Sequence, residues 1–196
     1  MDANPAQRPG RRRSEASRQA ILAAAAELIA QDGYGSLTIE NIARHSATGK
    51  QTIYRWWPSK ADVAMEALAD KTDLQVPIPD EGNFAADLRA VLSTSFALAR
   101  QPQVTEILRA LMAEAQIDDA FAQRFRSQFL ERRRRALHTI VDRAHARGEL
   151  PAGVPPDTVV DVVFGTLWYR VLAIPAPLDD VLADELVRIL APASPG

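Results

Sequence analysis

The chain has 196 residues, of which 47% are hydrophobic and 24% charged, as in an ordinary globular protein. No stretch approaches the roughly 18 apolar residues of a membrane span, and the charged, proline-bearing N-terminus lacks the apolar core of a secretory signal. Because the chain has no cysteine, disulfides and thiolate chemistry are excluded. We therefore expect a cytoplasmic protein with no membrane partner.

The net charge of −2 conceals an asymmetry along the chain. Residues 1–60 contain nine basic and five acidic residues, a balance of +4, whereas residues 61–196 contain fourteen and twenty, a balance of −6. A basic front followed by an acidic body is typical of a DNA-binding head attached to a domain that does not bind DNA. The alternative is that so small an excess of basic residues over residues 1–60 arose by chance.

Residues 1–13 contain proline, glycine and few apolar groups, which predicts a disordered basic arm. Its arginines, Arg11, Arg12 and Arg13, either form a solvated leader or reach the minor groove and flanking phosphates of DNA. A helix is expected over residues 14–31, because apolar residues recur on one face of it. Gly33 suits the left-handed position that follows a helix.

Two short helices joined by a tight turn are predicted between Thr38 and Pro58. The hydroxyl of Thr38 can accept a hydrogen bond from a backbone N–H of the first turn, as helix caps do. The small polar segment 46–49 suits the turn. A second helix follows over about 50–56, and Pro58 ends it because proline cannot continue the hydrogen-bond ladder.

The second short helix has the side chains of a DNA-reading element. Its register turns Ile53 and Trp57 inward and leaves basic and polar side chains outward. Lysine and arginine neutralise phosphates, while glutamine, threonine and tyrosine can also reach base edges. Together with the three arginines of the arm, the predicted DNA-binding residues are Thr38, Lys50, Gln51, Thr52, Tyr54, Arg55, Trp56 and Lys60.

The order T-I-E-x-I-A followed by K-x-T-I-Y-x-W-W-P-S-K resembles the DNA-binding domain of TetR-family transcriptional regulators, over roughly residues 14–68. The chain departs from the family at the turn, where Gly-Val-Ser is usual and Ala47-Thr48-Gly49 stands here. Ala47 is therefore expected to adopt a backbone conformation that glycine adopts more cheaply. The resemblance also implies that the rest of the chain binds a small effector.

The remaining sequence predicts an all-α fold of about nine helices, with a helix-turn-helix head over 14–60 and a larger body for effector binding and dimerisation over 61–196. Ser59 and Asp62 are close to a capping box at the start of the next helix. Segments FGTLWYR and PLDDVLADEL look like the C-terminal region of some TetR regulators. Further helices are expected at about 60–74, 84–100, 104–113, 119–148, 157–173 and 178–190.

The helix over 157–173 is apolar on nearly all sides, apart from Asp161 and Arg170. Such a helix needs cover on every face, so we expect the last two helices to pair with their copies in a homodimer. The alternative is a monomer whose own helices cover both faces. The predicted interface residues are Val160, Phe164, Leu167, Val171, Leu182, Leu186 and Ile189.

Aromatic residues recur four residues apart on the helix over 119–148, which indicates either plain core or an apolar effector pocket. The pocket reading adds apolar residues from the neighbouring helices. Its predicted lining is Phe96, Leu108, Leu111, Met112, Phe121, Phe125, Phe129, Phe164, Trp168 and Tyr169.

Two other groups of polar side chains, both on the helix expected over 119–148, are predicted to lie on a solvated surface. His138, Asp142 and His145 share a helix face whose spacing could hold a metal, but no cysteine or further histidine supports such a site. The run 132–135 consists of four arginines that point around the whole helix, which predicts a solvated run with carboxylate partners. No metal or cofactor is expected.

These features favour a ligand-responsive repressor that binds a palindromic operator as a dimer and is released by a small apolar or aromatic effector. An enzyme is a weaker alternative, since the sequence has no nucleophile–base pair, phosphate-binding glycine loop or strong metal cluster. A DNA-binding protein without an effector, whose body only dimerises, is the third.

Overall fold

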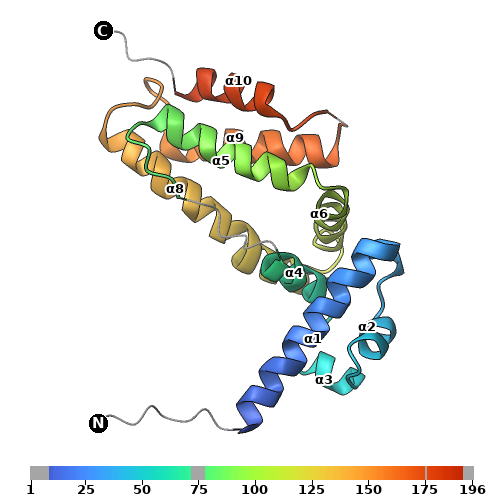
Figure 1. The fold of residues 1–196 in the computed structure, drawn as a ribbon. Helices are drawn as coiled ribbons and strands as arrows, with labels where there is room; N and C mark the ends of the chain where they lie inside the picture. The colour runs from blue at the N-terminus through green and yellow to red at the C-terminus, as the bar shows by residue number, and fades with distance from the viewer. Residues whose placement is uncertain (1–8, 72–77, 175, 192–196) are drawn as a thin grey trace, which may run out of the picture. The chain divides into compact units, whose positions relative to one another are not determined.

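The structure, a computed structural model, describes residues 9–71, 78–174 and 176–191, and within these ranges it contains helices and no strand (Figure 1). The predicted all-α fold is confirmed. The chain divides into two compact units, Met1–Asp73 and Leu74–Gly196. This boundary lies after the predicted position at 60–61, because the helix that follows residue 60 packs on the first helix. No helix in the described ranges is long and apolar enough to cross a membrane.

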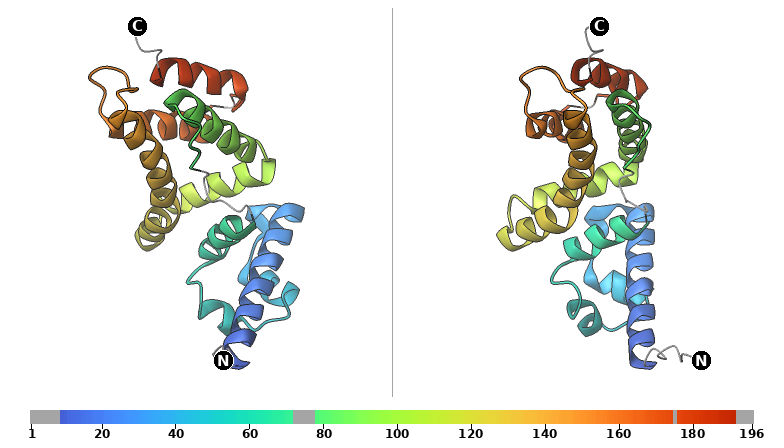
Figure 2. Two further views of the ribbon diagram at one scale, coloured as in Figure 1. Left: turned by 60° about the vertical axis from the view of Figure 1, so that its left-hand side comes forward. Right: turned by 90° about the vertical axis from the view of Figure 1, so that its left-hand side faces the viewer.

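The first unit is built on helix α1 (Pro9–Asp32), with α2 (Ile39–His45) and α4 (Lys60–Lys71) packed against it (Figures 1 and 2). A short 3₁₀ turn, η1 (Tyr34–Ser36), follows α1, and α3 (Lys50–Tyr54) packs on α2. The core of this unit includes large side chains that are no more than 2% exposed, among them Ile21, Leu37, Ile42, Ile53 and Trp57.

The beginning of α1 corrects the prediction of a disordered arm over 1–13. The helix begins at Pro9, and proline is favoured at a first helical position, where its missing N–H costs nothing. The arginines that follow are good helix formers. Residues 1–8, and the side chains of Arg11, Arg12 and Arg13, lie outside the described residues.

Both predicted helix caps are confirmed. The backbone N–H of Asn41 donates to Thr38 Oγ1 over 3.1 Å, which satisfies one orphan donor of α2. At the start of α4, the Ser59 N–H and hydroxyl donate to Asp62 Oδ2 over 3.1 and 2.7 Å, and the Asp62 N–H donates back to Ser59 Oγ over 3.3 Å. This reciprocal pattern is a capping box with aspartate as the acidic member.

The turn between α2 and α3 is a Schellman motif centred on Ala47. The N–H of Thr48 donates to the Ala43 carbonyl over 3.0 Å, and the N–H of Ala47 donates to the Arg44 carbonyl over 3.4 Å. Ala47 has φ of 53°, within the left-handed region that the motif requires. The expectation that this alanine takes a glycine-like conformation is therefore confirmed.

The second unit contains α5 (Phe84–Ala99), α6 (Pro102–Glu114), α9 (Pro156–Leu172) and α10 (Asp180–Leu190), together with one long helical run. That run consists of α7 (Asp119–Arg124), the π-helical segment η2 (Phe125–Leu130) and α8 (Glu131–Ala146). Helix α5 packs against both α8 and α10, and α9 packs against α8 and α6 (Figure 1).

A buried carboxylate ties the start of α5 to the end of α8. Asp87 is fully buried, and its Oδ1 accepts a hydrogen bond from the Glu81 N–H over 2.7 Å. Its Oδ2 lies 3.5 Å from Arg143 Nη2 and 3.6 Å from Arg147 Nη2. Glu149 pairs with Arg147 and accepts from the Phe84 N–H over 2.7 Å, so the start of α5 and the end of α8 are held together by charge-assisted bonds.

Candidate DNA-binding surface and ligand site

Helix α3 has one buried side and one exposed side, in the predicted orientation. Ile53 and Trp57 are 0% and 2% exposed and anchor the helix to the core of the first unit. Thr52 is half-buried. The exposed side presents basic, polar and aromatic side chains together, which are Lys50, Gln51, Tyr54, Arg55 and Trp56.

Trp56 stands out on this surface because it is a large indole left 41% exposed beside a charged side chain. The guanidinium carbon of Arg55 lies 5.9 Å from the centre of its ring, a cation–π distance. The buried Trp57 lies behind it, with ring centres 6.3 Å apart. The exposed indole therefore forms a flat apolar surface beside a cation.

Lys50 forms an ion pair within the first unit. Its Nζ lies 2.5 Å from Glu40 Oε1, which joins the first residue of α3 to the first turn of α2. The hydrogen bond with Lys50 lowers the pKa of Glu40, and the same bond raises the pKa of Lys50. Both side chains remain exposed, so the Lys50 ammonium is accessible to solvent.

Two other predicted DNA-binding residues already have contacts inside the unit. The hydroxyl of Thr38 caps α2, as described above. The Nζ of Lys60 lies 4.7 Å from the centre of the Tyr34 ring, and its side chain is half-buried. Lys60 is also the first residue of α4, where unpaired N–H groups favour an anion.

Glu66 of α4 fixes the support behind α3. Its Oε2 accepts a hydrogen bond from Trp57 Nε1 over 2.6 Å, and its Oε1 pairs with the Arg18 guanidinium of α1. A single carboxylate therefore links α1, α4 and the tryptophan that anchors the end of α3. The sequence singled out Trp57 but gave no sign of its partner, because that contact depends on tertiary packing.

In the second unit, the predicted aromatic stripe forms a stacked ladder. The rings of Phe121 and Phe125 have centres 5.8 Å apart, and those of Phe125 and Phe129 have centres 5.2 Å apart. The interplanar angles are 13° and 18°, and all three rings are buried. We refer to Phe121, Phe125 and Phe129 as the aromatic ladder.

Arg133 extends the aromatic ladder by one further step of four residues. Its guanidinium carbon lies 3.5 Å from the centre of the Phe129 ring, and its Nη1 donates to the Phe129 carbonyl over 3.0 Å. Its Nη2 is buried without a hydrogen-bond partner among the described residues. Desolvation lowers the pKa of Arg133 to about 10, with a further contribution from the charge of Arg132, so the side chain remains a cation at neutral pH.

Arg133 corrects the prediction that the four arginines of residues 132–135 form a solvated run. Arg132 and Arg135 are exposed, and Arg134 pairs with Asp161 of α9 over 2.7 Å. Arg133 is half-buried, and its guanidinium lies over the Phe129 ring with Nη2 shielded from solvent. The signal in the sequence was its position four residues after Phe129 and four before Leu137, which places it on the apolar face.

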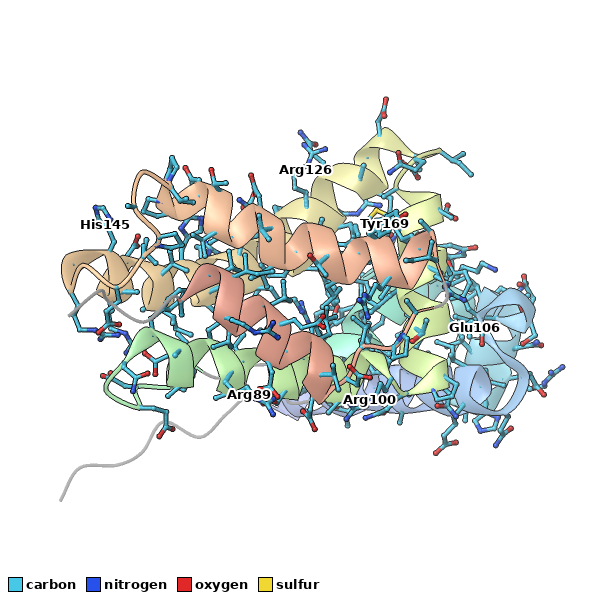
Figure 3. The ribbon with its side chains drawn as sticks, turned by 90° about the horizontal axis from the view of Figure 1, so that it is seen from above. Arg89, Arg100, Glu106, Arg126, His145 and Tyr169 are labelled. Carbon is cyan, nitrogen blue, oxygen red and sulfur yellow. The ribbon has the colours of Figure 1, made fainter. Side chains whose placement is uncertain are left out.

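The other residues predicted to line the pocket differ in their exposure to solvent. Phe96, Leu108 and Leu111 are buried, while Met112, Phe164 and Trp168 are half-buried. Tyr169 is 57% exposed and projects from α9 (Figure 3). We therefore remove Tyr169 from the proposed lining.

The predicted interface residues also differ in their exposure to solvent. Val160, Val171, Leu182 and Leu186 are buried within the subunit, so their surface is not available to a partner, whereas Ile189 is 65% exposed. Phe164 and Leu167 are half-buried. The apolar side chains that α9 and α10 expose are instead Val162, Tyr169, Leu172, Val181 and Ile189.

The histidine face of α8 is engaged with a neighbouring helix. His138 Nε2 lies 3.2 Å from Asp157 Oδ1 of α9, and His145 lies near the end of α8 (Figure 3). Among the described residues, no group of three or more metal-ligating side chains is close enough to hold an ion.

Comparison with protein families matches both units. A model described as bacterial regulatory proteins of the tetR family matches residues 21–69, and a model described as a tetracyclin repressor-like C-terminal domain matches residues 78–190. Together these models span the first unit from the middle of α1 and nearly all of the second.

Relatives with curated names include an uncharacterised HTH-type transcriptional regulator, YdeS, from Bacillus subtilis. It is 28% identical over 178 residues, which cover 91% of this chain and 89% of YdeS. A DNA-binding transcriptional repressor, TetR, from Mycobacteroides abscessus is 28% identical over 182 residues, covering 89% of this chain and 92% of the repressor.

Solved structures are similar over the same length. The crystal structure of the TetR family transcription regulator SCO0332 has a TM-score of 0.75 and 30% identity, covering 88% of this chain and 94% of that one. The regulator FadR from Bacillus subtilis, in complex with stearoyl-CoA, has a TM-score of 0.68 at 20% identity, covering 89% and 97%. The second similarity shows the fold alone.

Proposed function

The chain belongs to the TetR family of transcriptional regulators, and from that premise we propose that it is a ligand-responsive repressor which binds a palindromic operator as a dimer. The observation that carries the DNA-binding half is the exposed side of α3. It gathers two cations, an amide, a phenol and an indole on a helix whose opposite side is anchored in the core. A helix with this division fits the major groove, with its basic ends on phosphates.

Dimerisation is proposed from the apolar side chains that α9 and α10 leave exposed. Val162, Tyr169 and Leu172 lie at helical spacing on α9, and Val181 and Ile189 lie eight residues apart on α10. Exposed apolar side chains on a helix are available to a partner that would cover them. A two-fold dimer would present two α3 helices, and so would read two half-sites of a palindrome.

The effector half of the proposal is supported by the interior of the second unit. The aromatic ladder offers flat apolar surface, and an arginine with a buried, unpaired nitrogen lies at its end. Ligand sites are mostly apolar with a small number of polar groups. An effector acts by binding the DNA-free arrangement of the dimer more tightly than the DNA-bound one.

The proposal is tested by selecting bound sequences from random duplex DNA with the full-length protein. We expect a palindromic consensus for the wild type and no consensus for Tyr54→Ala. Because Tyr54 is exposed and supports no core contact, this variant should keep its fold. Ile117→Ala is the control, because that residue is exposed on the second unit. Enrichment of no sequence, or equal enrichment with Tyr54→Ala, would refute the assigned surface.

The effector is sought by screening compounds for release of the selected duplex. Release by an apolar or aromatic compound is expected. A protein that binds the operator but is released by no compound in a broad apolar and aromatic set would be a DNA-binding protein without an effector.

A further inference from the structure

Arg133 is half-buried between two buried apolar residues of the same helix face, and its Nη2 atom is shielded from solvent. Phe129, four residues before it, is 3% exposed, and Leu137, four residues after it, is 1% exposed. Residues four apart lie on the same face of a helix, so the guanidinium interrupts an otherwise apolar stripe. Burying a charge in such surroundings is costly unless it is paired.

Two other arginines of the second unit, Arg89 and Arg134, pair with carboxylates, whereas Arg100 and Arg109 donate to backbone carbonyls with their guanidinium groups. Arg89 contacts Asp180 and Asp184, at 3.1 and 2.6 Å. Arg134, directly after Arg133 in the chain, takes Asp161 at 2.7 Å. Within the described residues, by contrast, no carboxylate lies within ion-pair distance of Arg133, and the carbonyl of Phe129 is its hydrogen-bond acceptor.

The local backbone adds a second, independent observation. The π-helical segment η2, from Phe125 to Leu130, ends just before Arg133. Segments of π-helix are rare and are frequently found at functional sites. Here the segment contains Phe125 and Phe129 of the aromatic ladder, and the Arg133 guanidinium carbon lies 3.5 Å from the Phe129 ring centre.

We propose that Arg133 anchors the acidic head group of an amphipathic organic anion, whose apolar part packs against the aromatic ladder. This inference rests on the proposed effector function and specifies the class of effector. The free Nη2 would donate to one oxygen of a carboxylate or phosphate, both of which match the planar guanidinium. The unpaired cation thus acquires the partner that the chain itself does not supply.

The anchor also explains how an anion could change the state of the body. In the described structure Nη2 is shielded from solvent, so a ligand head group must displace the side chains that cover it. The free energy gained by pairing the guanidinium is available only in the ligand-bound arrangement. A ligand with this differential affinity shifts the balance between two arrangements of the protein.

The test uses matched acids and neutral esters on the full-length protein. Binding of 2-naphthoate, methyl 2-naphthoate and 2-naphthyl phosphate is measured by calorimetry, with decanoate and methyl decanoate as an aliphatic pair. We expect each acid to bind about ten- to a hundredfold more tightly than its ester, as for a hydrogen bond to a charged group. The phosphate arm distinguishes the two kinds of head group.

The variant is Arg133→Met, and the matched control is Arg132→Met, which removes an exposed arginine one residue away. Arg133→Met should abolish the preference for acids and leave ester binding intact, while Arg132→Met should behave as the wild type. Arg133→Met should also melt at or above the wild-type temperature, because methionine fits an apolar stripe and no unpaired charge remains.

Three results would overturn the inference: equal binding of acids and esters, a preference for acids that survives in Arg133→Met, or binding of no probe. A lower melting temperature for Arg133→Met would likewise assign the arginine a purely structural role. Operator release by the neutral esters alone would keep the proposed repressor function and reject the anion anchor. If the unliganded wild type did not bind the operator at all, the repressor function would be rejected instead. The binding of acids and esters measured by calorimetry would still test the anion anchor.

Discussion

Ala47 adopts the left-handed conformation at the turn between α2 and α3, with φ of 53°. A side chain there crowds the following carbonyl, which glycine avoids. We predict that Ala47→Gly raises the free energy of unfolding by about 0.5–1 kcal/mol. The control is Ala23→Gly, on the exposed side of α1, which should lower it by about 1 kcal/mol. Urea unfolding measures both, and a destabilising Ala47→Gly would contradict this account of the turn.

The ion pair between Lys50 and Glu40 makes a second prediction at the scale of single residues. Glu40 holds the Lys50 ammonium at 2.5 Å in the free protein, and it adds a negative charge beside the DNA-binding surface. Glu40→Gln should therefore tighten operator binding by roughly two- to fivefold. Fluorescence anisotropy with labelled duplex measures the change.

Glu27→Gln is the matched control for Glu40→Gln, because Glu27 is also an exposed acid of the first unit, paired with His45 at 3.0 Å. An equal gain with both variants would assign the effect to net charge rather than to the release of Lys50. The stability that the ion pair between Lys50 and Glu40 contributes also depends on pH. Because the pKa of Glu40 is lowered in the folded protein, its contribution to stability is complete above the ordinary carboxyl pKa and is lost as the pH falls through the lowered value.

At the scale of elements, Glu66 of α4 couples α1 to the segment that follows α3 through one carboxylate. We predict that Glu66→Ala lowers the free energy of unfolding by about 1–3 kcal/mol, because it leaves the Trp57 N–H and the Arg18 guanidinium without their acceptor. Trp57→Phe removes the N–H and keeps most of the ring. A double-mutant cycle between these variants should give a coupling energy of roughly 0.5–2 kcal/mol.

Asp70→Ala is the matched control for the cycle, since Asp70 is exposed on the same helix, and it should change stability by less than about 0.5 kcal/mol. A coupling energy near zero between positions 57 and 66 would show that the hydrogen bond at 2.6 Å contributes nothing to the docking of α4.

Local rules in the sequence predict the head well and the interior of the body less well. Thr38 and the pair Ser59 and Asp62 predict their caps because a cap involves only neighbouring residues. The π-helical segment escaped prediction, and 119–148 was expected to form a regular helix. In an α-helix, four residues overshoot a full turn by about 40°, so a strict repeat of four drifts around the axis. The wider π turn offsets this drift.

The same reasoning explains why the surface of α9 and α10 was only partly predicted. The apolar residues of α9 are nearly continuous, so periodicity does not separate the side that packs on α8 from the side that faces outward. Val160 and Val171 therefore looked equivalent to Val162, although the first two are buried in the subunit and the last is 38% exposed. Which side is covered depends on the positions of the neighbouring helices.

At the scale of the whole molecule, the proposed dimer depends on the apolar side chains that α9 and α10 expose. Val181→Glu combined with Ile189→Glu should convert a dimer into a monomer at micromolar concentration, because each charge would be buried in the interface. Sedimentation equilibrium measures the mass. Ile117→Glu is the control and should remain dimeric, since Ile117 is 83% exposed between α6 and α7. A wild-type mass of one chain would reject the dimer.

The central claim is that the exposed side of α3 binds the phosphates and base edges of operator DNA. The most direct test is the salt dependence of binding to the selected duplex, compared between the wild type and Lys50→Ala. The logarithm of the association constant should fall linearly with the logarithm of the salt concentration. Lys50→Ala should reduce that slope by roughly one for each bound subunit, with the fold unchanged. An unchanged slope and affinity in Lys50→Ala would contradict the claim.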